Sequence, residues 1–343
     1  MNDIRRQPKH QFAIRQAATA FRAGRKGTAD VIRLWVANTD QDWFDFLATQ
    51  PNIDEVNFWQ PSGVTSFSAI QPGELFLFRL KSPRNAIGGY GVFSHSSNLP
   101  ISLAWEAFGI KNGAHTLEQM RSRVEQYREG PLTNNDYTIG CRIVVQPVFF
   151  PEALWIPQPQ SWARSIVVGK TYITDDPEGL RLWNQVIDAG TQLGAGRISD
   201  PALGLSEYQA RYGEPTLIAP RLGQGAFRVA VTDAYARTCA VSGGKVLPAL
   251  DAAHIKPYAF GGAHSVSNGI LLRRDILSVF DAGYVTIDAE YRFVVSERIK
   301  TDFNNGNEYR RLHGTRLALP ASTLSRPDPQ LLQWHNNNVF RGS

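Results

Sequence analysis

Apolar positions along the chain form two patterns, continuous runs and helical spacing. The change from one pattern to the other separates expected strands from expected helices. Continuous apolar runs rich in β-branched and aromatic residues, typical of buried strands, occupy residues 31–38, 74–80, 85–93 and 137–150. Helical spacing replaces this pattern over residues 115–129, where the apolar positions are Leu117, Met120, Val124 and Tyr127. The first half of the chain is therefore expected to be rich in strands, with helices between them.

Start and stop signals predict further helices and the domain limits. Residues 12–24 are rich in Ala and Arg, and residues 175–190 begin with Asp-Asp-Pro-Glu and end at a glycine, as helices do. Over residues 191–225 the periodic pattern gives way to Gly, Ser, Pro and Arg. We therefore expect a first domain over residues 1–190, a linker over 191–225 and a second domain over 226–343.

Composition fits this division and favours an anionic partner. A chain of 343 residues is long enough for two domains that each bury a core. Lys and Arg number 36 against 31 Asp and Glu, a basic balance that suits nucleic acid. The two cysteines, Cys141 and Cys239, form no Cys-x-x-Cys pair, so a cytoplasmic location is expected. No apolar stretch is long enough for a signal peptide or a membrane span, so no membrane partner is expected.

The segment Cys239–Gly283 combines residue types that hydrolytic chemistry needs. A strand ends at His254, Asn268 precedes a second apolar strand, and a short helix from Arg273 ends in Asp-Ala-Gly. This order of strand, loop, strand and helix is the layout of a ββα-metal motif. The residues resemble the HNH endonuclease family, in the branch whose first histidine stands in an Ala-Ala-His-Ile-x-Pro run. The resemblance implies hydrolysis of phosphodiester bonds.

The resemblance also implies a role for each matching residue. His254 corresponds to the general base that activates water, and Asn268 to the asparagine that orients this histidine. Asp251 corresponds to an acidic metal ligand, and the implied cofactor is a divalent ion, Mg²⁺ or Mn²⁺. Leu277 stands at the helix position where the family carries a second histidine, also a metal ligand, and leucine has no donor atom.

Leu277 leaves three readings open. A deliberate inactivating substitution, a natural degenerate nuclease and a replacement donor elsewhere each explain it, and the first two imply an inactive or impaired chain. Asp251 has an alternative role as a turn residue before the strand. DNA contacts are expected from side chains of the connecting loop and of the helix start, namely Lys256, His264, Arg273 and Arg274.

The first domain carries a pattern of its own. A Trp-containing strand at residues 31–38 is followed by Asn-Phe-Trp at 57–59, a Pro-Gly-Glu turn into an apolar strand, and a glycine-rich strand at 85–93. This pattern resembles the PUA-like superfamily, which includes EVE and ASCH domains. It implies an N-terminal PUA-like β-barrel with helices and, with the C-terminal HNH domain, an α+β fold. The expected pocket for a flipped, modified base comprises Trp35, Asn38, Trp43, Phe58, Trp59 and Tyr90.

Together the two resemblances imply a type IV-like, modification-dependent restriction endonuclease that acts on double-stranded DNA with modified bases. A homodimer would supply the two nicks of a double-strand break. Two other classes stay open on the residues alone. One is a catalytically dead DNA-binding or sensing protein in which Leu277 is native. The other is an HNH effector whose first domain senses a small ligand or a partner protein.

Overall fold

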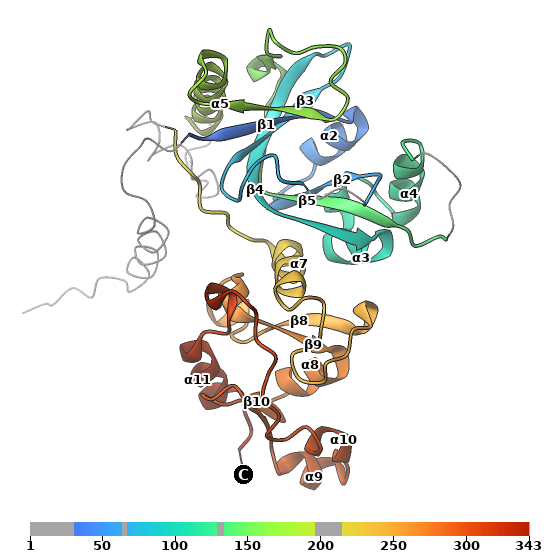
Figure 1. Cartoon of the computed structure of the whole chain (residues 1–343), viewed down its shortest axis with the longest axis vertical. Helices are drawn as coiled ribbons and strands as arrows, with labels where there is room; N and C mark the ends of the chain where they lie inside the picture. Colours follow the sequence, from blue (N-terminus) through green and yellow to red (C-terminus); the bar gives the residue numbers. More distant parts are fainter. Residues whose placement is uncertain (1–30, 64–66, 129–133, 196–214, 343) are drawn as a thin grey trace, which may run out of the picture.

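The chain forms two lobes joined by one helix (Figure 1). The ranges that the computed structural model describes are residues 31–63, 67–128, 134–195 and 215–342. We call the lobe up to residue 195 the N-terminal part and the lobe from Cys239 onward the C-terminal part. The helix expected at residues 12–24 lies outside the described ranges. No helix within them is long and apolar enough to cross a membrane.

The N-terminal part is built on one sheet. Its strands follow the order β2-β5-β4-β3-β1-β7, and β6 pairs with β4. Their bounds are β1 Arg33–Thr39, β2 Glu55–Gln60, β3 Leu75–Leu80, β4 Ala86–Pro100, β5 Thr138–Phe149, β6 Ile156–Pro157 and β7 Gly169–Ile173. β1 and β3 run parallel, whereas the other pairs are antiparallel. The strands expected from the apolar runs are confirmed as β1, β3, β4 and β5.

This sheet is open in the described residues, where a barrel was expected. β2 and β7 are its two edges, and no pairing joins them within these residues, so no closed barrel is detected. Register shifts at Tyr90/Val92 and Phe93/His95 mark irregularities that bend β4 against β5 without closing the sheet. The coarser expectation, an α+β fold with a large sheet and helices, is confirmed.

Both faces of the sheet are buried. Along β3, Leu75 and Leu77 pack on one face and Phe76 and Phe78 on the other, as strand alternation requires, and all four are fully buried. The phenylalanine face packs against α2 (Gln41–Ala48). The leucine face packs against α3 (Ile101–Phe108), α4 (Leu117–Glu125) and α5 (Pro177–Ala195). Two 3-10 helices, η1 (Gly109–Asn112) and η2 (Glu152–Leu154), lie in the same lobe.

Two expectations about helix ends are wrong. α5 continues past Gly190, its expected end, through Ala195. A Cβ added at Gly190 would lie 3.2 Å from the Tyr90 hydroxyl oxygen, so this glycine permits close packing of α5 on the sheet. Tyr127 was expected on the apolar face of the helix at residues 115–129, but α4 ends at Glu125 and Tyr127 is 49% exposed.

Helix α7 (Gln224–Ala234) contributes to the hydrophobic cores of both lobes. Ala226 and Val229 pack into the leucine-face core of the N-terminal part. Phe227 and Val231 pack into the core of the C-terminal part. In the view of Figure 1 the helix accordingly lies between the two lobes.

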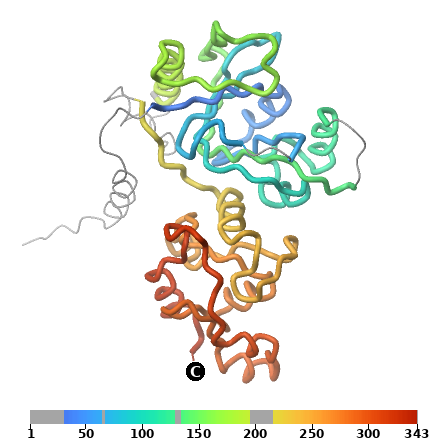
Figure 2. Tube along the Cα trace, viewed as in Figure 1, coloured from blue at the N-terminus to red at the C-terminus, as the bar shows by residue number. Residues whose placement is uncertain are grey.

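The start of α7 is fixed to the N-terminal sheet. The carboxylate of Glu55, fully buried on β2, accepts hydrogen bonds of 2.8 Å from the backbone N–H groups of Gly225 and Ala226. A carboxylate at a helix N-terminus is favourable because the unpaired N–H groups there carry partial positive charge. The chain reaches α7 through residues 215–223, which Figure 2 traces along the N-terminal part.

The C-terminal part begins with the expected order of strand, loop, strand and helix, which is confirmed. β8 (Leu250–His254) pairs antiparallel with β9 (Gly269–Arg273), and α8 (Arg274–Asp281) follows directly. The later elements are β10 Val285–Ile287, β11 Phe293–Val295, α9 Arg298–Phe303, α10 Asn307–Arg310 and α11 Pro329–Asn338. Short 3-10 helices stand at η4 Leu247–Ala249, η5 Tyr258–Phe260, η6 Val266–Asn268 and η7 Thr323–Ser325. α11 docks on the core through Leu332, which is 1% exposed.

Candidate active site

His254 lies at the end of β8 in a stack of aromatic rings. Its imidazole packs face to face on Phe227 of α7, with ring centroids 3.8 Å apart. Nε2 of His254 is 2.9 Å from Nδ1 of His264, so one of these two nitrogens donates to the other. The ring of His264 stacks in turn on Tyr258, with centroids 5.1 Å apart. The orientation of His254 is therefore fixed by a helix on one side and by the β8–β9 loop on the other.

This environment keeps His254 neutral. Burial, and then the nearby His264, lower the pKa of His254 to about 4. A neutral imidazole accepts a proton, as a general base must. Since Nε2 is occupied by His264 and Nδ1 has no hydrogen-bond partner among the described residues, Nδ1 is the nitrogen left for a water molecule.

Asn268 is fully buried and holds the loop between β8 and β9. Its Oδ1 accepts a hydrogen bond of 2.9 Å from the backbone N–H of Lys256. Its Nδ2 donates to the carbonyl oxygens of Lys256 and Ala263, also at 2.9 Å. These bonds close the loop that carries His264. Asn268 thus acts on His254 through the loop backbone, whereas its own side-chain bonds go to Lys256 and Ala263.

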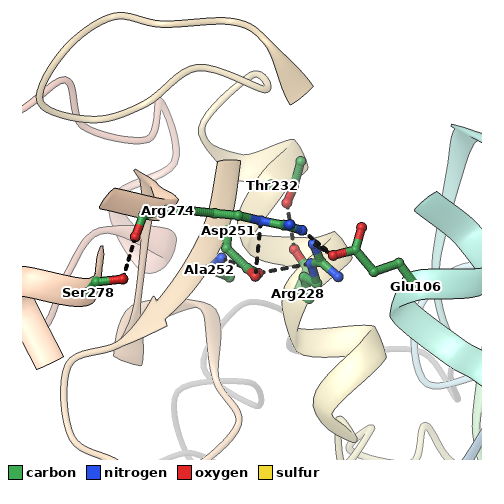
Figure 3. A network of polar contacts seen from close by, with 7 residues as sticks. All are labelled: Glu106, Arg228, Thr232, Asp251, Ala252, Arg274 and Ser278. Atoms are coloured by element: carbon green, nitrogen blue, oxygen red, sulfur yellow. Dashed lines mark hydrogen bonds and ion pairs between the residues drawn. The ribbon is translucent and has the colours of Figure 1, made fainter. Parts of the chain in front are cut away.

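Asp251 is engaged by two arginines (Figure 3). Its Oδ1 lies 2.9 Å from Nε of Arg228 on α7, and its Oδ2 lies 3.9 Å from Nε of Arg274 at the start of α8. Glu106 on α3 contacts both of these arginines from the N-terminal part. The carboxylate of Asp251, which was expected to bind a metal, therefore takes part in a network of ion pairs between the two lobes.

A cleft of about 570 Å³ opens beside these residues. Asp251, His254, Leu277 and Asp281 line it. Desolvation, and then the negative charge of Asp251, raise the pKa of Asp281 above its usual value. Two carboxylates and a neutral histidine on one cleft could activate and orient water beside an anionic substrate.

The residues present do not form a complete site for a divalent metal. No group of three or more His, Cys, Asp and Glu side chains in the described ranges is arranged to hold an ion. Leu277 offers no donor to the cleft, and both oxygens of Asp251 face arginines. This arrangement agrees with the departure from the family pattern that the sequence shows at Leu277.

None of the four residues expected to contact DNA lines the cleft, but two of them contact residues that do. His264 contacts His254, and Arg274 contacts Asp251. Nζ of Lys256 sits 5.3 Å from the ring centroid of Trp334 on α11, at the edge of the loop. Arg273 is paired with Asp275, 2.5 Å from its Oδ2, and does not line the cleft.

Most of the expected base pocket is occupied by packing. Trp43 and Tyr90 are 2% and 1% exposed and belong to opposite cores of the sheet. Nδ2 of Asn38 donates to the carbonyl oxygens of Ile166 and Val167. Nε1 of Trp59 donates to the carbonyl oxygen of Asn112 at 3.1 Å. The six residues therefore do not line one common cavity.

Trp35 and Phe58 are both neighbours of a buried arginine, Arg142. Arg142 of β5 pairs in register with Phe58 of β2, and its guanidinium is 4.3 Å from the ring centroid of Phe67 and 5.7 Å from that of Trp35. Arg142 is 5% exposed, its Nε and Nη1 have no hydrogen-bond partner, and burial lowers its pKa to about 10. Nε1 of Trp35 is also buried and unpartnered. Unsatisfied buried donors next to aromatic rings mark a place where a ligand acceptor would be stabilised.

Several residues of the site were missed by sequence reasoning. Arg228 and Glu106 join the site only through folding, because they come from α7 and from the other lobe. Asp281, the last residue of α8, also lines the cleft and was not among the expected site residues. Tyr258 and Phe260, 70% and 65% exposed, also line the cleft. Two exposed aromatic residues after Pro257 in a loop were a readable signal, since binding residues concentrate on loops.

Comparison with known proteins agrees with this geometry. Residues 239–288 match the sequence model of the HNH endonuclease family, and the match covers β8, β9 and α8. No curated protein matches the sequence.

Proposed function

With an HNH endonuclease domain at residues 239–288 as the premise, we propose that this protein hydrolyses phosphodiester bonds of double-stranded DNA. The observation that carries the proposal is His254, a neutral imidazole with an unpartnered Nδ1 on a cleft of about 570 Å³. In the proposed reaction, Nδ1 takes a proton from water, and the water oxygen forms a bond to phosphorus as the P–O bond to the leaving sugar oxygen breaks. The leaving oxygen takes a proton from solvent water. Arg274 beside the cleft offsets charge on the phosphate.

The proposal extends to target choice by the N-terminal part. Arg142, held between Phe67 and Trp35 with free donors, supports recognition of a flipped base, because guanidinium donors suit the acceptor edge of a base. A base that carries a modification is the proposed ligand, which makes the protein a modification-dependent restriction endonuclease. A homodimer would place two such sites on the two strands.

A second candidate function is supported by Leu277 and by the pairing of Asp251 with arginines. Both features leave the metal position incomplete, and both are expected of a protein that binds DNA without cutting it. In this candidate, the domain serves as a docking module. An N-terminal part that senses a small ligand would use the same Arg142 region.

Cleavage assays decide between the two candidates. The full chain, Leu277→His and the double variant Leu277→His/His254→Ala would be incubated with duplex DNA, with and without modified cytosines, in Mg²⁺ or Mn²⁺. We expect slow cleavage by the full chain and faster cleavage by Leu277→His. Adding His254→Ala should abolish cleavage, and adding His115→Ala, at an exposed histidine of the N-terminal part, should not. DNA binding without cleavage by any form would favour the docking module.

Selection of modified bases has its own test. Arg142→Gln should reduce the ratio of affinities for modified and unmodified duplex, whereas Arg164→Gln, an exposed arginine of the same lobe, should leave the ratio unchanged. Thermal melting of both variants separates loss of recognition from loss of folding. A full chain that binds both duplexes equally would refute the reader role while leaving the nuclease role standing.

A further inference from the structure

Two arginines and two carboxylates meet where α3, α7, β8 and α8 come together (Figure 3). Nη2 of Arg228 lies 3.1 Å from Oε1 of Glu106, and its Nε lies 2.9 Å from Oδ1 of Asp251. Nη2 of Arg274 contacts the same Oε1 of Glu106, and its Nε lies 3.9 Å from Oδ2 of Asp251. Each arginine therefore bridges one carboxylate of the N-terminal part and one of the C-terminal part.

The helices that carry Glu106 and Arg228 are packed rigidly together. At Gly225 of α7, an added Cβ would lie 2.6 Å from the carbonyl oxygen of Ala107, so α3 and α7 approach as closely as glycine allows. Glu55 caps the same end of α7. The carboxylate of Glu106 is thus delivered to a fixed place in front of the arginines.

The ion pairs of Glu106 with the two arginines are accessible to a ligand that could replace one partner. The side chain of Glu106 is 40% exposed, that of Arg274 46% and that of Arg228 19%. Ion pairs with this much exposure contribute little to stability and are screened by salt. A rigid frame that holds weak, accessible ion pairs at the side of a catalytic cleft is suited to a ligand that replaces one partner.

We propose that Arg228 and Arg274 form a binding site for one backbone phosphate of nucleic acid, and that Glu106 occupies this site in the free protein. This inference rests on the proposed function in DNA cleavage or docking. Guanidinium groups bind phosphate and carboxylate through the same planar fork of N–H donors. Oε1 of Glu106 accepts from both arginines, an arrangement that a phosphate oxygen would take over.

Charge balance explains how Glu106 controls the site. Two arginines with Asp251 alone carry a net charge of +1, and Glu106 brings the total to zero. DNA must therefore displace Glu106 before it gains the full attraction of the arginines. Because the side chain of Glu106 is partly exposed, it can turn away while α3 stays in place, and this would free the phosphate site next to Asp251.

Binding of duplex DNA in EDTA tests the inference without relying on cleavage. The full chain, Glu106→Gln and the control Glu118→Gln would be titrated at several salt concentrations; Glu118 is an exposed acid on α4 with the same charge. We expect Glu106→Gln to bind roughly 3- to 10-fold more tightly, because it removes two exposed ion pairs that compete with phosphate. Its salt dependence should steepen by about one phosphate contact. The control should bind as the full chain does.

A double variant distinguishes the site from a general charge effect. Arg228→Gln added to Glu106→Gln should cancel the gain, because the phosphate would lose one of its two arginines. Equal affinity of Glu106→Gln and Glu118→Gln, or a gain that survives Arg228→Gln, would overturn the inference. If Glu106→Gln melts far below the full chain, Glu106→Asp is used in its place. This variant keeps the charge but moves it one methylene away from the arginines, so it should also bind DNA more tightly than the full chain does. Failure of the unmodified chain to bind any duplex would overturn the proposed function as well, so the two failures are distinguishable.

Discussion

Asn268→Ala gives the sharpest test of how the site is held in place. The substitution removes three hydrogen bonds of 2.9 Å and leaves the N–H and C=O of Lys256 without their partner, whereas the C=O of Ala263 still accepts from the N–H of Ser265. At about 1 kcal/mol for each bond, the free energy of unfolding should fall by about 3 kcal/mol. The matched control is Asn336→Ala on α11, which loses one bond of 2.9 Å to the carbonyl oxygen of Ile287 and should cost about 1 kcal/mol.

Urea unfolding followed by far-ultraviolet circular dichroism measures both losses. NMR titration of His254 adds a local readout, because the loop that Asn268 holds also positions His264 against the imidazole. A loosened loop would admit water, and the pKa of His254 should then rise from about 4 toward its ordinary value. Equal unfolding midpoints for Asn268→Ala and Asn336→Ala, with an unchanged His254 titration, would refute the assigned role of Asn268.

Four further outcomes are expected. Leu277→His adds an imidazole donor to the cleft and should tighten Mn²⁺ binding at least about tenfold in calorimetry, or about 1.4 kcal/mol. Tyr258→Ala, which removes an exposed ring from the cleft, should weaken DNA binding by about 1–3 kcal/mol and leave the melting temperature unchanged. Glu55→Gln weakens the cap on α7 and should lower the free energy of unfolding by about 1 kcal/mol in urea. Burial lowers the pKa of His335 to about 4, so the neutral form stabilises the fold above pH 6.5; about 3 kcal/mol is lost as pH falls from 6.5 through 4, and His335→Gln should flatten that part of the stability profile.

The local sequence pattern was sufficient to predict those elements whose residues lie close together along the chain. The run Leu-Asp-Ala-Ala-His forms β8, and Asn268, fifteen residues after Ala253, directly precedes β9. The spacing of strand, loop and helix in this motif is short enough to be read from the chain. The same holds for the strand that became β3, whose unbroken apolar run predicts burial on both faces.

Contacts between distant segments could not be read in this way. Glu106 and Arg228 are 122 positions apart, and no period in either helix shows that they pair. Trp43 and Tyr90 were placed in a binding pocket because aromatic residues suit one, yet the same residues fill cores, and only the sheet decides which occurs. The burial of Arg142 could not be predicted from the sequence either, because it follows from pairing with Phe58 across β2 and β5.

The position of α7 gives the two lobes a physical route by which one can affect the other. Phe227 stacks on the proposed base, His254, and the next residue, Arg228, binds Asp251 and Glu106. The start of this helix is fixed to β2 through Glu55. Because α7 is attached to β2, a movement of the N-terminal sheet relative to the C-terminal part would carry α7 with it and would move a ring contact and a charge contact of the cleft at the same time. Ligand binding in one lobe would then change both the environment of His254 and the pairing of Asp251 in the other.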